Sequence, residues 1–209
     1  MNSLETGDIL LFHGTNYWFS TMVEYVTGSA YSHVAMVVRD PTDLDPNLKG
    51  LYMIESGREH FPDAIRHRIT FGVQIVDLIE VIKLYTGTIY YRKLHFSNNQ
   101  TIEMQNRLSM EAILSNKIWP LIKDSPYDRN PWDLLKAGFG IKWGNNNRTD
   151  AYFCSALVCF LLEKFGLITI PTEWDLIQPK DFDNGGRIEK IMTVIMQPRT
   201  ALSYNKHIY

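Results

Sequence analysis

A cysteine at the start of a predicted helix is the first candidate for chemistry in this chain. Between Phe153 and Gly166 the apolar residues recur at the spacing of one helical face, and Cys154 begins that stripe. Free backbone N–H groups and the helix dipole favour a thiolate at such a position, and they can also bind a developing oxyanion. Cys154 is therefore a candidate nucleophile. The alternative is a small apolar core residue, which is the role we expect for Cys159 in the middle of the helix.

A thiol needs a base, and His33 is the best candidate among the six histidines. It begins the apolar run HVAMVV directly after Ser32, where a strand end would hold the imidazole rigidly. Glu55, in the later run LYMIE, could orient that imidazole. If the two runs form an antiparallel hairpin centred on the loop between them, His33 and Glu55 lie directly opposite each other, and a one-residue slip separates them. The alternatives are a histidine that caps a sheet edge and an exposed strand carboxylate.

These residues need a sheet and a helix to position them. Apolar runs bounded by turn-forming residues predict strands in the first half of the chain, and helical spacing predicts one short helix there. A longer helix is predicted from about Thr101 to Lys123, and an aromatic and glycine-rich insert at about 124–150 precedes the Cys154 helix. The predicted strands are 9–12, 33–38, 51–55, 72–78 and 89–94, with a late strand or sheet edge at 191–196 and the short helix at 17–26.

Composition narrows the class of protein. The 209 residues, 45% of them hydrophobic, are enough for one domain with a real core, and we expect a single domain over 1–209. The net charge of −2 predicts no nucleic-acid partner and gives no sign of membrane or lipid contact. The longest apolar stretches are shorter than the ~20 residues of a membrane span, and no signal peptide precedes them. Two cysteines five positions apart in one helix do not suit a disulfide, so we expect a reducing, cytoplasmic location.

The order of the motifs resembles a known superfamily. GDILLF, YSHVAMVV, YMIESG followed by GVQIVDL, and DAYFCSALVCFLLEKFG resemble the signature segments of the permuted NlpC-type papain-like cysteine hydrolases. Within that superfamily they are most similar to the YiiX-like bacterial proteins and their relatives in poxviruses and other large DNA viruses. The resemblance implies an α+β, permuted papain-like fold, in which a partly barrel-like antiparallel sheet packs against the helix of the nucleophilic cysteine. It also implies that the chain, if viral, acts in the host cytoplasm or the virion.

The same resemblance implies roles for particular residues. The catalytic triad falls on Cys154, His33 and Glu55, and the chemistry is transfer of an acyl group through a thioester. Tyr152 and Phe153 flank the nucleophile, and the Cys154 backbone N–H is the expected oxyanion donor. The implied reaction needs no metal or other cofactor, and the spacing of Cys and His residues matches no zinc site. The aromatic insert departs from the superfamily pattern, and three of its residues are candidates for a substrate wall particular to this chain, with core packing as the alternative: Tyr127, Trp132 and Trp143.

The substrate is less closely defined than the triad. The superfamily acts on peptide or isopeptide amides, on amides of cell-wall peptides and on lipid acyl groups, and the absence of a signal peptide argues against the cell wall. We therefore expect a hydrolase of amide or peptide bonds. The alternatives are a lipid acyl hydrolase or acyltransferase, for which the insert would form an apolar lid, and a catalytically lapsed binding or virion component. The sequence does not indicate an oligomeric state.

Overall fold

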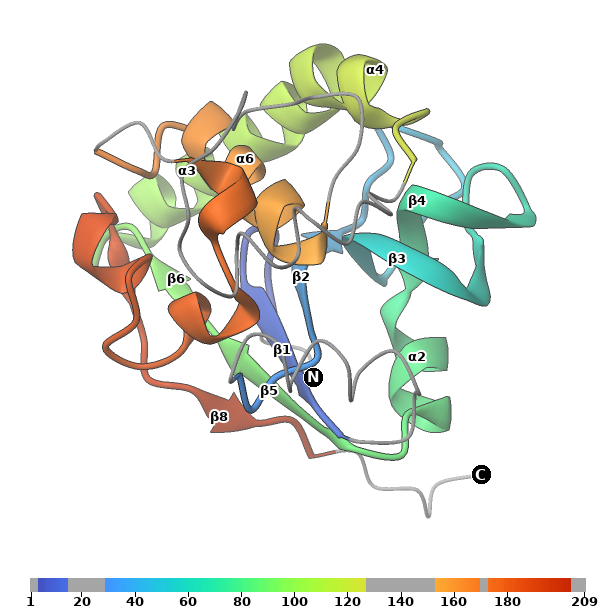
Figure 1. The fold of residues 1–209 in the computed structure, drawn as a ribbon. Helices are drawn as coiled ribbons and strands as arrows, with labels where there is room; N and C mark the ends of the chain where they lie inside the picture. The colour runs from blue at the N-terminus through green and yellow to red at the C-terminus, as the bar shows by residue number, and fades with distance from the viewer. Residues whose placement is uncertain (1–3, 15–28, 127–152, 170–172, 204–209) are drawn as a thin grey trace.

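The computed structural model describes residues 4–14, 29–126, 153–169 and 173–203 of the chain. It is a mixed α+β structure built on an antiparallel sheet whose strands lie in the order β4-β3-β2-β1-β5-β8 (Figure 1). A second, two-stranded sheet pairs β6 with β7. The predicted helix at 17–26 and nearly all of the insert lie outside the described residues. The strand bounds are β1 Ile9–His13, β2 His33–Arg39, β3 Leu51–Asp63, β4 Arg68–Asp77, β5 Thr88–Arg92, β6 Leu94–His95, β7 Ile195–Met196 and β8 Thr200–Ala201.

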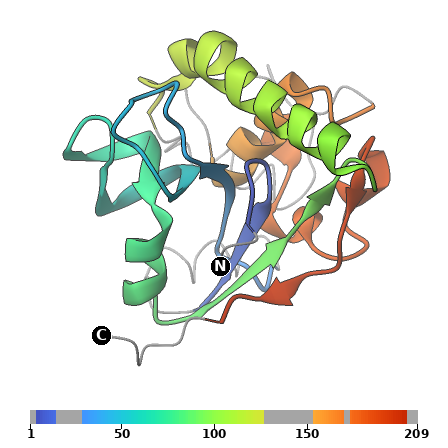
Figure 2. The same ribbon diagram turned by 180° about the vertical axis from the view of Figure 1, so that it is seen from behind.

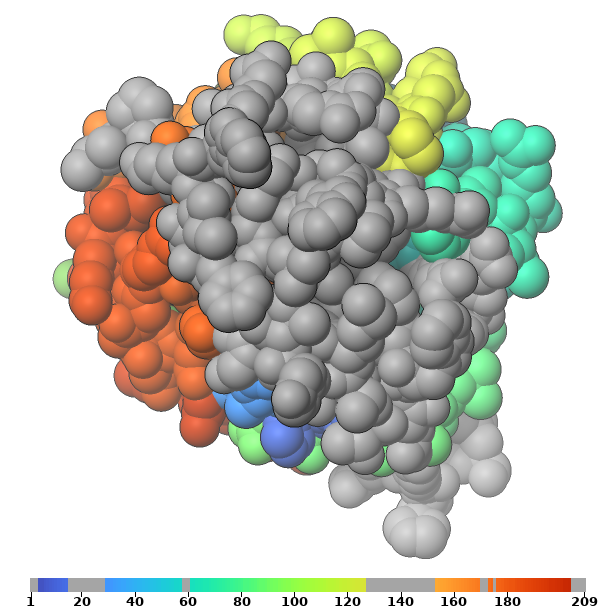
Figure 3. All heavy atoms as spheres, viewed as in Figure 1, coloured from blue at the N-terminus to red at the C-terminus, as the bar shows by residue number. Residues whose placement is uncertain are grey.

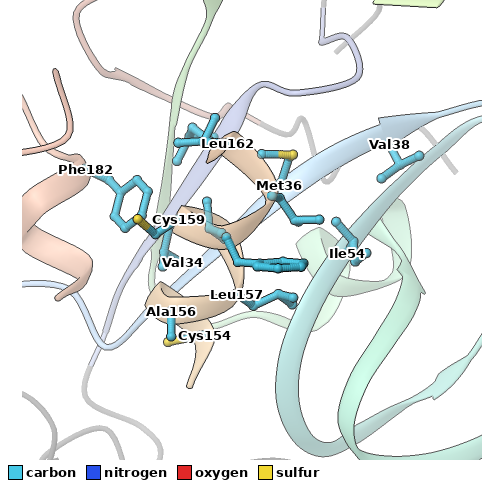
Figure 4. Packing of buried hydrophobic residues seen from close by; sticks show 14 of the residues in the cluster. Val34, Met36, Val38, Ile54, Cys154, Ala156, Leu157, Cys159, Leu162 and Phe182 are labelled. Carbon is cyan, nitrogen blue, oxygen red and sulfur yellow. The ribbon is translucent and has the colours of Figure 1, made fainter. Parts of the chain in front are cut away.

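The central strands are buried on both faces, which explains why their sequences are continuous apolar runs. Alternate residues of β2 divide between two core clusters, because successive side chains of a strand point to opposite faces. Val34 and Met36 belong to the cluster that contains α6 (Cys154–Lys164), as Figure 4 shows from close by. Ala35 and Val37 belong to the cluster on the other face. The sheet therefore lies between two apolar layers, and only one of them contains the cysteine helix.

A short helix directly after β4 was not predicted. The expected strand at 72–78 ends one residue earlier, and α2 (Leu78–Leu84) begins there. The Asp77 side chain accepts hydrogen bonds from the backbone N–H groups of Ile79 and Glu80, which is the usual bonding of a helix N-cap. An aspartate followed three residues later by Glu80 is a recognisable start signal, but the strand-like residues before it concealed the signal.

The long helix predicted at 101–123 is confirmed, with one irregularity. It consists of α3 (Gln100–Ile113), a π-helical turn (Leu114–Ile118) and α4 (Trp119–Ile122) in direct succession. Figure 2 shows these elements as one helical rod along the edge of the molecule. Buried Arg107 attaches α3 to the rest of the chain: it donates to the Asp8 carboxylate at 3.0 Å and to the carbonyl oxygens of Thr6 and Leu94.

The segment after α6 folds back against that helix. It contains three short 3₁₀ turns, at Trp174–Leu176, Pro179–Phe182 and Glu189–Ile191, before β7 and β8. In the space-filling view this segment and the β3–β4 hairpin lie at opposite sides of the same face (Figure 3). The late strand predicted at 191–196 is reduced to Ile195–Met196. Within the described residues, no helix is both long enough and apolar enough to cross a bilayer.

Candidate active site

Cys154 is the first residue of α6, as its place in the sequence predicts. Phe153 before it has the extended backbone of an N-cap residue, with φ −73° and ψ 160°, and contributes no side-chain cap. The hydroxyl of buried Ser155 donates to the carbonyl oxygen of Ile177 at 2.6 Å, which holds the first turn of the helix in place. The Cys154 side chain lies at this end of the helix (Figure 4), and the residue is 6% exposed.

His33 is the first residue of β2 and makes a hydrogen bond at each end of its imidazole. Its Nε2 lies 2.6 Å from Oε2 of Glu55, and since a carboxylate only accepts, the imidazole donates this bond. The ring also shares a hydrogen bond with the Cys154 thiol, for which Nδ1 is the remaining ring nitrogen. The Phe12 ring packs edge-on against the imidazole with 5.2 Å between ring centroids. The structure thus brings Cys154, His33 and Glu55 into one hydrogen-bonded row.

The strand register that brings His33 and Glu55 together differs from the predicted one. Met36 lies opposite Ile54, so β3 is displaced by two residues and Glu55 is diagonal to His33 rather than directly opposite. A shift of two residues keeps both side chains on one face, whereas a shift of one would not. Continuing the register puts Gly57 opposite His33. A Cβ atom at Gly57 would lie 2.7 Å from Oε1 of Glu55, so the glycine leaves the space into which the carboxylate turns.

The electrostatics of the row favour a thiolate and an imidazolium. Burial alone would raise the pKa of Cys154. The net pKa of this thiol is nevertheless below its ordinary value, because the charge of the His33 cation and hydrogen bonding from His33 lower it, as do the backbone N–H groups of Val34 and Ser155. Burial alone would lower the pKa of His33, but the Cys154 thiolate and the Glu55 carboxylate raise it to about 10. Each charged group therefore stabilises the other, which favours the ion pair over the neutral thiol and imidazole.

The residues predicted to surround the triad have mixed outcomes. Phe153 is buried directly before Cys154. The Ser32 hydroxyl donates to the Phe12 carbonyl oxygen at 3.3 Å, so its described contact is with β1. The other near-site predictions lie outside the described residues: Tyr152, Tyr127, Trp132 and Trp143.

Cys159 matches its prediction as a core residue. It is fully buried in α6, and burial, aided by the nearby Glu163 carboxylate, raises the pKa of its thiol. Its side chain points towards Phe182 and away from Cys154 (Figure 4). The two thiols of the chain therefore have opposite environments, and only that of Cys154 favours the reactive form.

Two contributors to the site were not identified from the sequence. Gln74 lies opposite Glu55 in the β3–β4 ladder, and its amide nitrogen donates to Oε1 of Glu55 at 2.7 Å. The signal was a polar residue inside the apolar run GVQIVDL, where an amide needs a buried partner. The backbone N–H of Val34, which donates to the Cys154 sulfur, has no sequence signal because it depends on where α6 meets β2.

Among the described residues, no three His, Cys, Asp or Glu side chains are placed so that they could hold one metal ion. The arrangement of Cys154, His33 and Glu55 by itself suits nucleophilic chemistry, because the imidazole lies between the thiol and the carboxylate and interacts with both. The prediction that the reaction needs no cofactor remains a prediction.

Comparison with known proteins gives similarity among solved structures but not among sequences. No family model and no curated protein sequence matches the chain. Among solved structures, the fold is similar to the crystal structure of the metalloprotein YiiX from Escherichia coli O157:H7 (DUF1105), with 14% sequence identity and a TM-score of 0.46. The similarity covers 97% of this chain and 98% of that one. YiiX belongs to the group that the motifs resemble, but at this level of similarity no property of that protein is transferred to this chain.

Proposed function

We propose that the chain is a cysteine hydrolase that cleaves amide or peptide bonds through Cys154, His33 and Glu55. The main support is the environment of the Cys154 sulfur, in which the His33 cation and hydrogen bonding from His33 and the backbone N–H groups of Val34 and Ser155 lower the pKa of the thiol. A thiol that served only as apolar filler would gain nothing from three donors, whereas a thiolate is stabilised by each of them.

The proposed reaction begins from the thiolate and the imidazolium. The sulfur attacks the substrate carbonyl, and the developing oxyanion is stabilised at the amino terminus of α6, where the Cys154 N–H lies before the first intrahelical bond at Leu157. His33 then gives its proton to the leaving amine, which leaves an acyl-thioester on Cys154. Water then attacks the thioester and gives a proton to His33. This step releases the carboxylic acid and restores the thiolate and the imidazolium. Glu55 stays ionised throughout and stabilises the imidazolium.

The fold and the cellular location belong to the same proposal. The histidine strand precedes the cysteine helix in the chain, which supports the interpretation as a permuted papain-like domain with a partly barrel-like sheet. Both cysteines are free thiols, which suits a reducing, cytoplasmic compartment where Cys154 would stay active. The proposed partner is a peptide or acyl-amide substrate.

Alkylation of the native protein by iodoacetamide across pH, with the modified cysteine identified by mass spectrometry, tests the proposal first. Cys154 should react well below its ordinary pKa of 9.0, and Cys159 should not react until the protein unfolds. Loss of His33 in His33→Ala should slow the reaction, and Cys159→Ala should leave it unchanged. Labelling of Cys154 only after denaturation would overturn the enzyme proposal in favour of a binding role.

Electrophilic probes with different acyl groups then separate the substrate classes. The proposed substrate is a peptide or acyl-amide. A peptide-based probe should therefore label Cys154 faster than a probe with a long fatty acyl chain. The opposite order would favour the lipid alternative. Cys154→Ala is the negative control for both probes.

A further inference from the structure

The second oxygen of the Glu55 carboxylate has its own partner, away from His33. Oε2 faces His33, whereas Oε1 accepts a hydrogen bond from Nε2 of Gln74 at 2.7 Å. Glu55 and Gln74 are directly opposed in the β3–β4 ladder, so the bond joins two neighbouring strands. Both residues are buried, at 7% and 1% exposure. The carboxylate is therefore held from both sides, and a rotation that satisfied one partner better would weaken the bond to the other.

Thr70 fixes which way the Gln74 amide faces. Its hydroxyl lies 2.9 Å from Oε1 of Gln74 and donates to it. An amide that accepts at its oxygen from Thr70 must turn its NH₂ group towards Glu55, and a carboxylate can only accept from it. The bonds therefore run in one direction, from the Thr70 hydroxyl through the Gln74 amide to Glu55 and on to His33.

A bend in β4 makes this row possible. Residues four apart in a regular strand are separated by roughly 13 Å, too far for a threonine to reach a glutamine side chain. Between Thr70 and Gln74 lies Gly72, whose φ of +137° is a conformation that favours glycine. A side chain at Gly72 would also collide with the carbonyl of Ser125, which bonds to Val73 at 3.0 Å. The sequence TFGVQ thus bends the strand where the row needs it (Figure 1).

We propose that Gln74 is a positioning residue of the candidate active site, and that Thr70 and Gln74 together hold the Glu55 carboxylate towards His33. The inference rests on the proposed function, because it assigns a role within the same site. An amide suits the role for a physical reason: a lysine or arginine at this position would compete with the His33 imidazolium for the negative charge. The neutral amide satisfies Oε1 and leaves the charge of Glu55 to act on His33.

The test is the pH dependence of Cys154 alkylation by iodoacetamide in the full chain. Gln74→Met keeps the length of the side chain and removes its donor. It should raise the pH midpoint of alkylation by about half a unit to one unit, which is a roughly three- to tenfold slower reaction below the midpoint. Thr70→Val should shift the midpoint in the same direction by less, because the amide remains but is no longer oriented. Thr70→Ser keeps the hydroxyl and should restore the wild-type profile.

Val76→Ala is the matched control for loss of stability. Val76 is buried in the same strand and takes no part in the row, so its truncation should lower the melting temperature and leave the alkylation midpoint unchanged. If Gln74→Met and Thr70→Val behave like Val76→Ala, the two residues are only structural and the inference is overturned. Should Gln74→Met fail to fold, the contrast between Thr70→Val and Thr70→Ser decides the question.

The same experiment separates this inference from the proposed function. Wild-type protein and His33→Ala are measured beside the β4 variants. A wild-type thiol that alkylates only near its ordinary pKa, with no effect of His33→Ala, contradicts the proposed function itself. If the wild-type thiol is activated but the pH midpoint of its alkylation is the same in the Gln74 and Thr70 variants, the proposed function is retained and the role of these two residues is refuted.

Discussion

Removing both members of the Cys154–His33 pair, in a Cys154→Ala/His33→Gln double variant, should change how the free energy of unfolding depends on pH. In the proposed resting state the folded pair holds one proton, on the imidazole. Between the ordinary pKa values of 6.5 for His33 and 9.0 for Cys154, the unfolded chain also holds one proton, on the thiol. Unfolding in this window neither takes up nor releases a proton at the pair, so the contribution of the pair is independent of pH there.

The contribution should change above pH 9.0, where the unfolded thiol ionises. The raised pKa of His33 gives stability that is complete below 6.5 and is lost as the pH rises through about 10. The lowered pKa of Cys154 gives stability that is complete above 9.0 and is lost as the pH falls. The two slopes cancel below 9.0 for as long as Cys154 is ionised in the folded protein, and above 9.0 only the His33 slope remains. Stability should then fall by up to about 1.4 kcal/mol per pH unit, which amounts to roughly 1 kcal/mol by pH 10.

Urea unfolding of the wild type and the double variant, across pH values from 6.5 to 10, measures the difference directly. Cys159 and Tyr31, whose pKa values are also raised, titrate in both proteins and cancel. The pH dependence of this difference in unfolding free energy is predicted and its absolute size is not, because replacing a buried ion pair with uncharged residues can stabilise or destabilise. A difference that falls from pH 6.5 onwards would mean that the folded protein holds a neutral thiol beside the imidazolium. A difference that stays flat to pH 10 would mean that the folded pair loses its proton at the same pH as the unfolded chain, so that neither pKa is shifted by folding.

Three substitutions test other parts of the structure. Glu55→Gln should raise the pH midpoint of Cys154 alkylation by about one unit, because the imidazolium loses a charged partner worth more than a neutral one; an unchanged midpoint would exclude this role of Glu55. Gly57→Ala should raise the same midpoint by less, since its Cβ would lie 2.7 Å from Oε1 of Glu55, and a wild-type midpoint in a folded variant would contradict the packing argument. Arg107→Met should cost about 3 kcal/mol at neutral pH by leaving Asp8 buried without its cation. Because burial raises the pKa of Asp8, that cost should shrink in acid as the carboxyl takes up a proton, and a cost independent of pH in thermal unfolding would refute this explanation.

The sequence was sufficient to predict the elements of the candidate triad. The β2 run is a strand because its residues are β-branched or apolar and continuous, and α6 is a helix because its apolar residues recur at helical spacing. Both signals depend on neighbouring residues alone, so they can be recognised without knowledge of the fold. The shared face of His33 and Glu55 was also predictable, since it depends only on parity. It withstood the two-residue difference in register.

The remaining features of the site depend on contacts between distant parts of the chain. The register of β3 against β2 reflects a loop whose length does not determine where pairing begins. The row from Thr70 to Glu55 needs the bend at Gly72, and that bend is packed against Ser125, more than fifty residues later in the sequence. No propensity of TFGVQ by itself predicts such an approach. Side-chain partners of this kind become visible only when the strands are paired.

The hydrogen bond from Ser155 to Ile177 has a consequence for how the chain is made. His33 and Glu55 leave the ribosome early, Cys154 much later, and the carbonyl of Ile177 that anchors the first turn of α6 later still. Contacts between such distant residues form late, because the intervening chain must first be closed into a loop. A growing polypeptide therefore contains His33 and Glu55 long before the first turn of α6 can be anchored. The surroundings of Cys154 are complete only after the chain has been made beyond Ile177.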